Sequence, residues 1–277
     1  MLHQNFVTLY FTKPRALGRY TARGQAMFTI TNSKLKSFAP TWSRFHGFSL
    51  LFDNPGENLR DDGKYNTLTT RLEIEFYAAL TQALARIGGS LLTNTYLFAP
   101  LPSNSYHVTA WDGINYENIA DVHADYRQQA ADFLAELPHS IAFATPFTEL
   151  VNKSPLLQNQ QMLTLCFDKL YIWGNNVLVA ALRPAEDCIM QFDTLKQKRA
   201  AHNEKFAEEF GCSAFANYTP HVSLGYFANQ ESAQLASARL SEWRGEFTRI
   251  MDRQTLSVSS IRLFGFTDMA TFVTSRP

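Results

Sequence analysis

Two stretches of the chain, Tyr106-His107-Val108-Thr109-Ala110 and Pro220-His221-Val222-Ser223-Leu224, determine how the rest of the sequence is interpreted. Each places a histidine two positions before a hydroxyl residue, inside a short apolar run that is typical of a β-strand. Side chains alternate between the two faces of a strand, so each histidine is expected beside its hydroxyl partner. The sequence therefore predicts one arrangement twice: an imidazole next to a hydroxyl on a stiff strand.

The ordinary alternative is that each histidine sits at the end of a core strand and has no chemical role. A single short match of this kind is weak. From average residue usage, a histidine is followed by valine and then serine or threonine about one time in a hundred. The chain contains seven histidines, so one match is unremarkable, whereas two matches in the same strand setting favour a functional site.

The pair of motifs resembles the twin His-x-Thr/Ser signature of the 2H phosphoesterase superfamily. That superfamily includes cyclic phosphodiesterases and bacterial RNA 2′,3′-cyclic phosphodiesterase-like proteins. The flanking segments 105–113 and 219–227 resemble those of an uncharacterised branch, and the resemblance covers roughly residues 45–270. One departure is the spacing, because 114 positions separate the two histidines. Compact members have a shorter spacing, and we expect the extra material within residues 112–165.

The resemblance implies an α+β fold with two pseudo-equivalent lobes of antiparallel sheet and flanking helices. The motif strands would face each other across a central cleft. It also implies a metal-independent phosphodiesterase without a cofactor, which opens a 2′,3′-cyclic phosphate to a 2′-phosphate. The residues that match the motifs, and are expected to be catalytic, are His107, Thr109, His221 and Ser223.

In-line hydrolysis of a phosphodiester suits this set of residues. One proton must leave the attacking water and another must reach the departing oxygen on the opposite side of phosphorus. Histidine titrates near neutral pH and can do either task, while the two hydroxyls can donate hydrogen bonds to the non-bridging oxygens. Strand alternation places Trp111 and Phe227 on the same faces as the histidines, where they are expected to stack a base of the substrate or to serve as core or rim aromatics. Which histidine is the acid stays open at this point.

Two alternatives belong to other classes of protein. A metal site would be built from His107, His221, His46 or His202, but the short spacings typical of such sites, HxxxH or HD, do not occur. A binding module with the same cleft and no turnover also fits the motifs. The expected partner in each case is a nucleotide or an RNA end, with no membrane, and we expect a monomer.

Composition sets further limits. The chain has 277 residues, 45% of them hydrophobic, and a formal net charge of zero, which argues against a nucleic-acid coat protein. Three cysteines without CxxC spacing indicate a reducing compartment. No apolar run approaches the roughly 18 residues of a membrane span, and we expect a cytoplasmic protein. A net charge of zero favours a mononucleotide or a short RNA end over long RNA as the substrate.

Charge is nevertheless uneven. Residues 1–52 contain no Asp or Glu and seven basic residues: Lys13, Arg15, Arg19, Arg23, Lys34, Lys36 and Arg44. Residues 1–44 are interpreted as a basic N-terminal arm, either solvated or forming a positive rim that attracts phosphates. Residues 45–277 are interpreted as one bilobal domain, with lobes at about 45–150 and 160–277.

Apolar periodicity and turn signals predict the elements. Strands are expected at 47–52, 91–98, 140–149, 163–171, 177–182 and 255–266 besides the two motif strands. Helices are expected at 66–87, 116–137, 185–210 and 230–243, with Gly211 ending the third of them. His123, His139 and His202 are interpreted as surface residues.

Overall fold

The computed structural model describes residues 5–8, 27–36, 42–52, 60–61, 65–70, 74–158 and 161–275. Their strands form two large antiparallel sheets and a separate hairpin, β1 (Asn5–Thr8) with β2 (Met27–Ile30). The first sheet has the order β4 (Arg60–Asp61), β5 (Tyr65–Thr67), β13 (Thr271–Ser275), β12 (Ile261–Asp268), β3 (Gly47–Phe52) and β7 (Thr109–Asn115). The second has the order β11 (Thr255–Val258), β8 (Leu163–Trp173), β9 (Val177–Pro184), β10 (His221–Phe227) and β6 (Phe98–Pro100).

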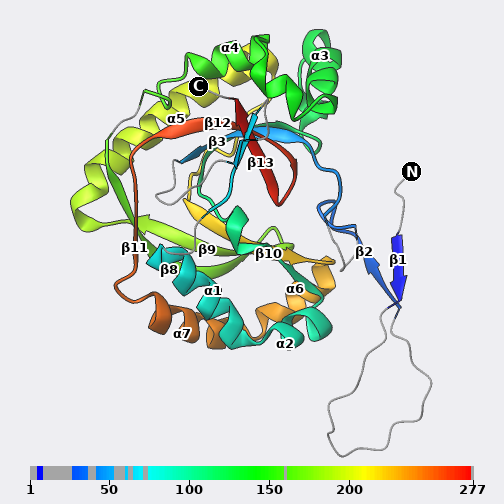
Figure 1. Cartoon of the computed structure of the whole chain (residues 1–277), viewed down its shortest axis with the longest axis vertical. Coiled ribbons are helices and arrows are strands. Elements are labelled where there is room, and N and C mark those ends of the chain that lie inside the picture. Colours follow the sequence, from blue (N-terminus) through cyan, green and yellow to red (C-terminus); the bar gives the residue numbers. More distant parts are fainter. Residues whose placement is uncertain are drawn as a thin grey trace, which may run out of the picture.

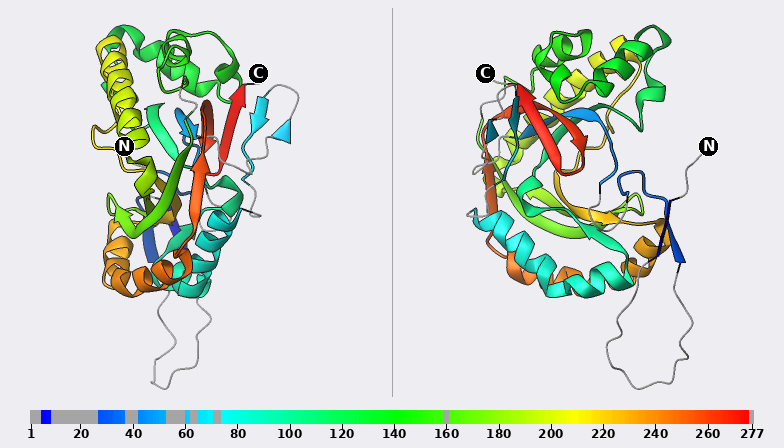
Figure 2. Two further views of the ribbon diagram at one scale, coloured as in Figure 1. Left: turned by 90° about the vertical axis from the view of Figure 1, so that its left-hand side faces the viewer. Right: turned by 45° about the vertical axis from the view of Figure 1, so that its right-hand side comes forward.

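Helices cover the outer sides of this pair of sheets. Below the second sheet in Figure 1 lie α1 (Glu75–Ile87), α2 (Gly89–Thr95), α6 (Gln230–Ser237) and α7 (Leu240–Met251). At the opposite end lie α3 (Ala124–Ala135), α4 (Pro146–Asn152) and α5 (Ile189–Phe210), and the views in Figure 2 keep the same separation. The predicted α+β class, with two antiparallel sheets and flanking helices, is confirmed.

The two sheets take strands from both halves of the chain. β12 and β13 follow β10 in sequence but join the first sheet, whereas β6 precedes β7 and pairs with β10 in the second. The reason lies in β3, in which all six residues are buried. The backbone N–H and C=O groups of a buried strand need hydrogen-bond partners on both edges, and β12 and β7 supply them. The sheets therefore combine strands from the ranges 45–150 and 160–277, which were expected to form separate lobes.

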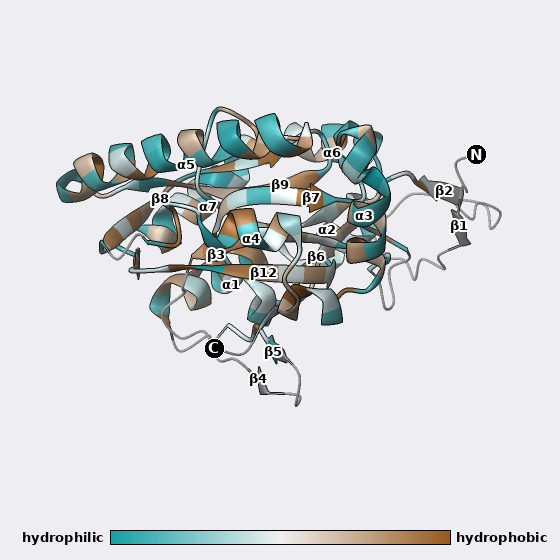
Figure 3. Ribbon diagram, turned by 90° about the horizontal axis from the view of Figure 1, so that it is seen from above, coloured by the Kyte–Doolittle hydropathy of each residue, from teal (hydrophilic) through white to brown (hydrophobic). Residues whose placement is uncertain are grey.

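The helix α5 is the longest element and ends where the sequence predicts. Gly211 adopts a left-handed conformation (φ 84°), which closes the helix without the steric cost of a side chain. Figure 3 shows hydrophilic residues along much of α5, interrupted by hydrophobic turns. Its buried residues recur every three or four positions and include His202, which is 1% exposed. The expectation that His202 lies on the surface is wrong, whereas His123 and His139 are exposed as expected.

Two predicted strands are helices instead. The range 91–98 is mostly α2, and 140–149 contains a 3-10 turn (His139–Ala142) followed by α4. The physical reason in the second case is a capping box at Thr145, whose hydroxyl accepts a hydrogen bond from the Thr148 amide, with a proline at the first helical position. Helices α1 and α3 are also shorter than the predicted ranges 66–87 and 116–137.

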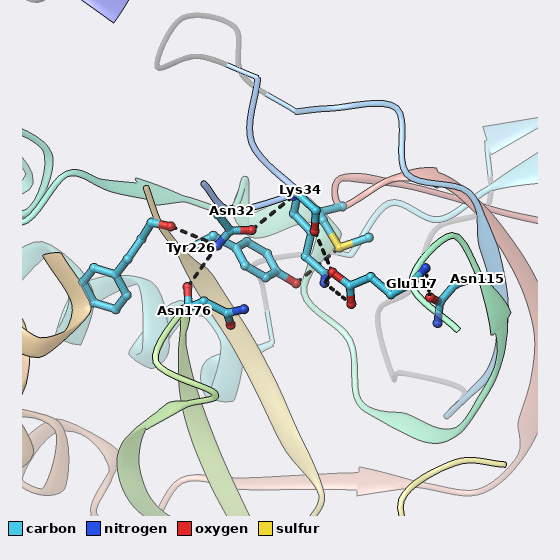
Figure 4. Close-up of polar contacts among 9 residues, drawn as sticks. Asn32, Lys34, Asn115, Glu117, Asn176 and Tyr226 are labelled. Carbon is cyan, nitrogen blue, oxygen red and sulfur yellow. Dashed lines mark hydrogen bonds and ion pairs between the residues drawn. The ribbon is translucent and has the colours of Figure 1, made fainter. Parts of the chain in front are cut away.

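The segment that follows β2 interacts with both large sheets through polar contacts (Figure 4). The Asn32 side-chain amide donates to the Phe227 carbonyl at 2.9 Å, at the end of β10. Lys34 Nζ lies 2.9 Å from a carboxylate oxygen of Glu117, just after β7. This ion pair neutralises Lys34, so Lys34 does not serve as an unpaired cation of the expected basic rim.

Two further basic residues of the arm lie in the described part of the chain. Lys36 and Arg44 are exposed. Lys13, Arg15, Arg19 and Arg23 lie outside the described residues. Within the described part of the chain, no helix combines the length and apolarity that a bilayer crossing requires.

His202 makes stability depend on pH. Neither of its ring nitrogens has a hydrogen-bond partner, and burial lowers its pKa to about 4. The unfolded chain, in which histidine titrates near 6.5, then binds more protons than the folded chain below that pH. The free energy of unfolding should therefore fall as the pH drops from about 6.5 to about 4, by on the order of 3 kcal/mol from this group.

We expect His202→Phe to reduce this loss, so that the variant gains stability over the wild type at pH 5 compared with pH 7. Urea unfolding at both pH values measures the difference. His123→Gln changes an exposed histidine and serves as the control. An unchanged pH slope in the His202 variant would contradict the assignment.

Candidate active site

The two motif histidines are held in the same way. His107 Nδ1 lies 2.7 Å from the Ser105 carbonyl oxygen, and His221 Nδ1 lies 3.0 Å from the Thr219 carbonyl oxygen. A carbonyl oxygen only accepts, so Nδ1 carries the proton in each ring. Each imidazole is thereby oriented by the backbone two residues before it, and its Nε2 remains for chemistry.

Each imidazole also packs against an aromatic ring. The His107 and Phe272 ring centroids are 4.3 Å apart, and those of His221 and Trp173 are 4.9 Å apart. Burial lowers the pKa of His107 to about 4, and the charge of His221 contributes to this shift. His107, two residues before β7 of the first sheet, and His221, the first residue of β10 in the second, therefore lie close enough to interact electrostatically.

A β-bulge follows the hydroxyl residue of the first motif. Thr109 pairs with Leu51, but Trp111 pairs with the next residue of β3, so Ala110 is an extra residue without a partner. An extra residue reverses the alternation of faces beyond it. Asp112, which pairs with Ser49, consequently lies on the face of Thr109, and Trp111 lies on the opposite face.

The second motif also contains a β-bulge after its hydroxyl residue. Ser223 pairs with Val179, and Gly225 pairs with the residue of β9 next to it, which leaves Leu224 as the extra residue. Tyr226 therefore shares the face of Ser223, and the two side chains are hydrogen-bonded to each other. Asp112 and Tyr226 each follow their motif histidine by five positions. This shared spacing is the signal in the sequence that could have identified both.

The two aromatics expected to bind substrate lie elsewhere. Trp111 is 1% exposed, its Nε1 donates to Asn203 Oδ1 at 3.1 Å, and its ring packs edge-on against His202. Phe227 is fully buried, with its ring centroid 5.1 Å from that of Phe98. The bulges turn both side chains to the face away from the histidines. The aromatics that contact the motif histidines are Phe272 and Trp173, neither of which belongs to a motif.

Asp112 adds a negative charge to the site. Its side chain is exposed, yet the surrounding protein desolvates it and raises its pKa, an effect opposed by the charges of His221 and Arg199. In return, Asp112 raises the pKa of His221, which burial otherwise lowers. The pKa of His107 has no such contribution from a carboxylate. The two imidazoles are therefore equivalent in geometry but not in electrostatics.

Hydrogen bonds from Arg199 of α5 connect the first bulge to the loop before β10. Arg199, 4% exposed, donates from Nε to the Ala110 carbonyl at 3.0 Å and from Nη1 to the Phe215 carbonyl at 2.7 Å. The Tyr218 hydroxyl donates to the Thr109 carbonyl at 2.9 Å, and the Arg199 guanidinium lies over the Tyr218 ring at 4.9 Å. These bonds satisfy the carbonyls that the bulge frees and connect the two motifs.

The side chains do not assemble the alternative metal site. His46 is buried, with Nδ1 bonded to the Leu134 carbonyl and Nε2 accepting from Arg44 Nε at 3.0 Å. Among the described residues, no group of three or more His, Cys, Asp or Glu is arranged to hold a metal ion. A cavity of about 370 Å³ lies beside His202, between α4 and α5, and neither motif histidine lines it.

Comparisons with known proteins give only distant similarity. No family model matches the chain, and no curated protein matches it. A conserved protein of unknown function from Agrobacterium tumefaciens is 14% identical over 88% of this chain and 89% of its own, with a TM-score of 0.49. Usb1 of Kluyveromyces marxianus, solved with uridine monophosphate, is 10% identical over 84% of this chain and 97% of its own, with a TM-score of 0.36. A second structure of that Usb1 is 12% identical, with a TM-score of 0.37. Similarity at this level identifies no function.

The second bulge depends on the absence of a side chain at Gly225. A Cβ there would lie 2.4 Å from the Ala99 carbonyl oxygen and 2.4 Å from the Phe98 ring. We expect Gly225→Ala to push β6 away from β10 and to lower the free energy of unfolding by roughly 1–3 kcal/mol, as overpacking does.

Gly245→Ala is the matched control, because nothing lies within 4 Å of a Cβ at this position inside α7. It should raise stability by up to about 1 kcal/mol through helix propensity. Urea unfolding of both variants measures the contrast. Equal effects of the two substitutions would show that the contact with β6 is not restrictive.

Proposed function

We propose that the protein is a metal-independent phosphodiesterase that hydrolyses the 2′,3′-cyclic phosphate of a nucleotide or RNA end to a 2′-phosphate. One observation carries the proposal: two imidazoles, one just before β7 and one at the start of β10, are each held through Nδ1 by a backbone carbonyl and lie within electrostatic range of each other. Each also has a hydroxyl residue two positions further on. An acid and a base on opposite sides of one phosphorus atom require such a pair.

The electrostatics favour His107 as the base. Its low pKa keeps it neutral at working pH, so that Nε2 can take a proton from the attacking water. Asp112 favours the charged form of His221, which can then protonate the departing 3′ oxygen of the ribose as the P–O bond breaks. The proton gained by His107 and the proton lost by His221 balance over one turnover through solvent.

The hydroxyls would act on the charge of the phosphate. Thr109 and Ser223 are partly exposed. Ser223 lies on the same face of β10 as His221, and Thr109 is the first residue of β7, two positions after His107. Each can donate a hydrogen bond to a non-bridging oxygen, where negative charge remains throughout the reaction. Neither needs to act as a nucleophile in this scheme, because water attacks phosphorus directly. The predicted cytoplasmic location and monomeric state remain predictions.

The histidine pair is tested by substitution. His107→Ala and His221→Ala should each lower kcat by about two to four orders of magnitude, the usual range for a positioned acid or base. The double variant should lose little more than either single one, because the two residues act as a unit. Chromatography of a nucleoside 2′,3′-cyclic phosphate and its products, with protein pretreated with EDTA, measures the rates.

His123→Ala, at an exposed histidine outside the site, should retain wild-type turnover. Near-wild-type turnover in either motif variant would exclude the mechanism. Tight binding of the cyclic nucleotide by wild-type protein without turnover would identify a binding module instead.

The acid and base assignment predicts the pH dependence. The value of kcat/KM should rise as the pH passes about 4, where His107 loses its proton, and should fall as His221 deprotonates below its ordinary value of 6.5. Removal of the negative charge in Asp112→Asn makes the His221 imidazolium less stable. The alkaline limb of the profile should therefore move to lower pH in this variant, while the acid limb moves less.

Asp193→Asn provides the control, since this exposed carboxylate lies on α5 in an ion pair with Lys196. Its pH profile should match that of the wild type. An alkaline limb unmoved in the Asp112 variant would show that Asp112 does not support His221. An acid limb that moves more than the alkaline limb would reverse the two roles.

A further inference from the structure

The face of the second sheet that carries His221 continues across β9 to β8. His221 pairs with Ala181 of β9, and Ala181 pairs in turn with Lys169 of β8. Two and four positions further along β8, Tyr171 and Trp173 lie on this same face, because side chains alternate along a strand. We call Lys169, Tyr171 and Trp173 the β8 row.

The two rings of the β8 row form a stepped aromatic surface that begins at His221. Trp173 packs edge-on against His221, and its ring centroid lies 6.4 Å from that of Tyr171. Trp173 is partly exposed and Tyr171 is 41% exposed. Exposed aromatic rings that continue directly from a candidate catalytic histidine are suited to hold part of the same substrate.

The opposite face of β8 packs against the hydrophobic core. Leu170 and Ile172 alternate with the β8 row and are buried, and the Leu170 carbonyl accepts a hydrogen bond from Arg244 of α7. The Phe167 ring, on the same face as Leu170, lies 6.0 Å from the Phe247 ring of α7, so α7 covers the face opposite the β8 row. Tyr171 and Lys169 remain exposed on the other face.

Lys169 places a positive charge at the end of the row away from Trp173, and this charge favours binding of a polyanion. The Lys169 side chain is 56% exposed, and its Nζ lies 3.8 Å from a carboxylate oxygen of Asp168, a long contact that leaves the ammonium accessible. Aromatic rings that alternate with basic groups are the usual surface for single-stranded nucleic acid. An acidic peptide would use the lysine but would gain little from two stepped rings.

We propose that the β8 row binds the nucleotides that precede the cyclic phosphate of a single-stranded RNA end, with one base on Trp173, the preceding base on Tyr171 and a backbone phosphate near Lys169. This inference rests on the proposed function, because His221 sets where the terminal phosphate lies. Side chains two positions apart on a strand are about 6.6 Å apart. Sheets that present aromatic rings at such intervals stack successive bases in other RNA-binding folds. The substrate is therefore an oligonucleotide rather than the mononucleotide that the neutral net charge favours.

The test compares two substrates, a nucleoside 2′,3′-cyclic phosphate and an adenosine trinucleotide with the same cyclic end. For the wild type, kcat/KM should be about five- to a hundredfold higher for the trinucleotide, the gain from stacking additional bases. In Tyr171→Leu this ratio should fall several-fold toward one. Tyr171 is exposed and has no contact with His221 among those described, so a change in the ratio reports on binding of the additional bases.

Trp173→Leu should lower the ratio as well. Lys169→Ala should remove about one phosphate contact, so that the slope of log(kcat/KM) against log[salt] for the trinucleotide becomes shallower by roughly 0.7. Phe143→Leu is the matched control. It removes a ring that is 59% exposed in the loop before α4, and it should leave the ratio at the wild-type value. Thermal unfolding checks that each variant is folded.

A wild-type ratio near one, or an unchanged ratio in Tyr171→Leu, would refute the proposal that the β8 row binds RNA, while the proposed function stands. If neither substrate is hydrolysed, the proposed function fails and the row is tested by binding alone. The dissociation constants of an adenosine trinucleotide ending in a 2′-phosphate and of adenosine 2′-phosphate are then compared by tryptophan fluorescence. Tighter binding of the trinucleotide that is lost in Tyr171→Leu supports the row, and equal binding of the two refutes it.

Discussion

The candidate site depends on the hydrogen bonds that stabilise an interrupted strand. A bulge in β7 frees backbone carbonyls that cost free energy if they are buried without a partner. Arg199 and Tyr218 satisfy the carbonyls of Ala110 and Thr109. Since Arg199 lies on α5 and Tyr218 lies just before β10, the same bonds hold the first motif strand, the long helix and the entry to the second motif in one arrangement.

The bulges also decide which chemical groups meet. Without the extra residue, β7 would present Trp111 beside Thr109, and β10 would present Phe227 near Ser223. With it, a carboxylate and a phenol occupy those places, and the two large apolar rings enter the core. A pair of bulges thus converts two amphipathic strands into a polar site, which agrees with the frequent occurrence of bulges next to functional positions.

Partial burial makes the two imidazoles suitable for different tasks. Packing against Phe272 and Trp173 removes water from both rings and favours their neutral forms. Asp112 opposes this effect at His221. Two groups of the same type with different surroundings can therefore have different protonation states at one pH, which an acid and base pair requires.

The sequence by itself determined the two motifs, the strand character of β3, β8, β9 and β10, the end of α5 at Gly211 and the α+β class. The strands and the helix end follow from local periodicity, turn residues and backbone preferences, which act over a few positions. The α+β class was implied by the resemblance of the two motifs to a known superfamily. Only the tertiary structure decided the exchange of strands between the two sheets, the burial of His202 and the faces beyond each bulge. A bulge is stabilised by partners such as Arg199, 89 positions from Ala110, and strand alternation carries no information about bonds of such long range. The aromatic neighbours of the histidines were likewise hidden, because Phe272 and Trp173 approach them from other strands.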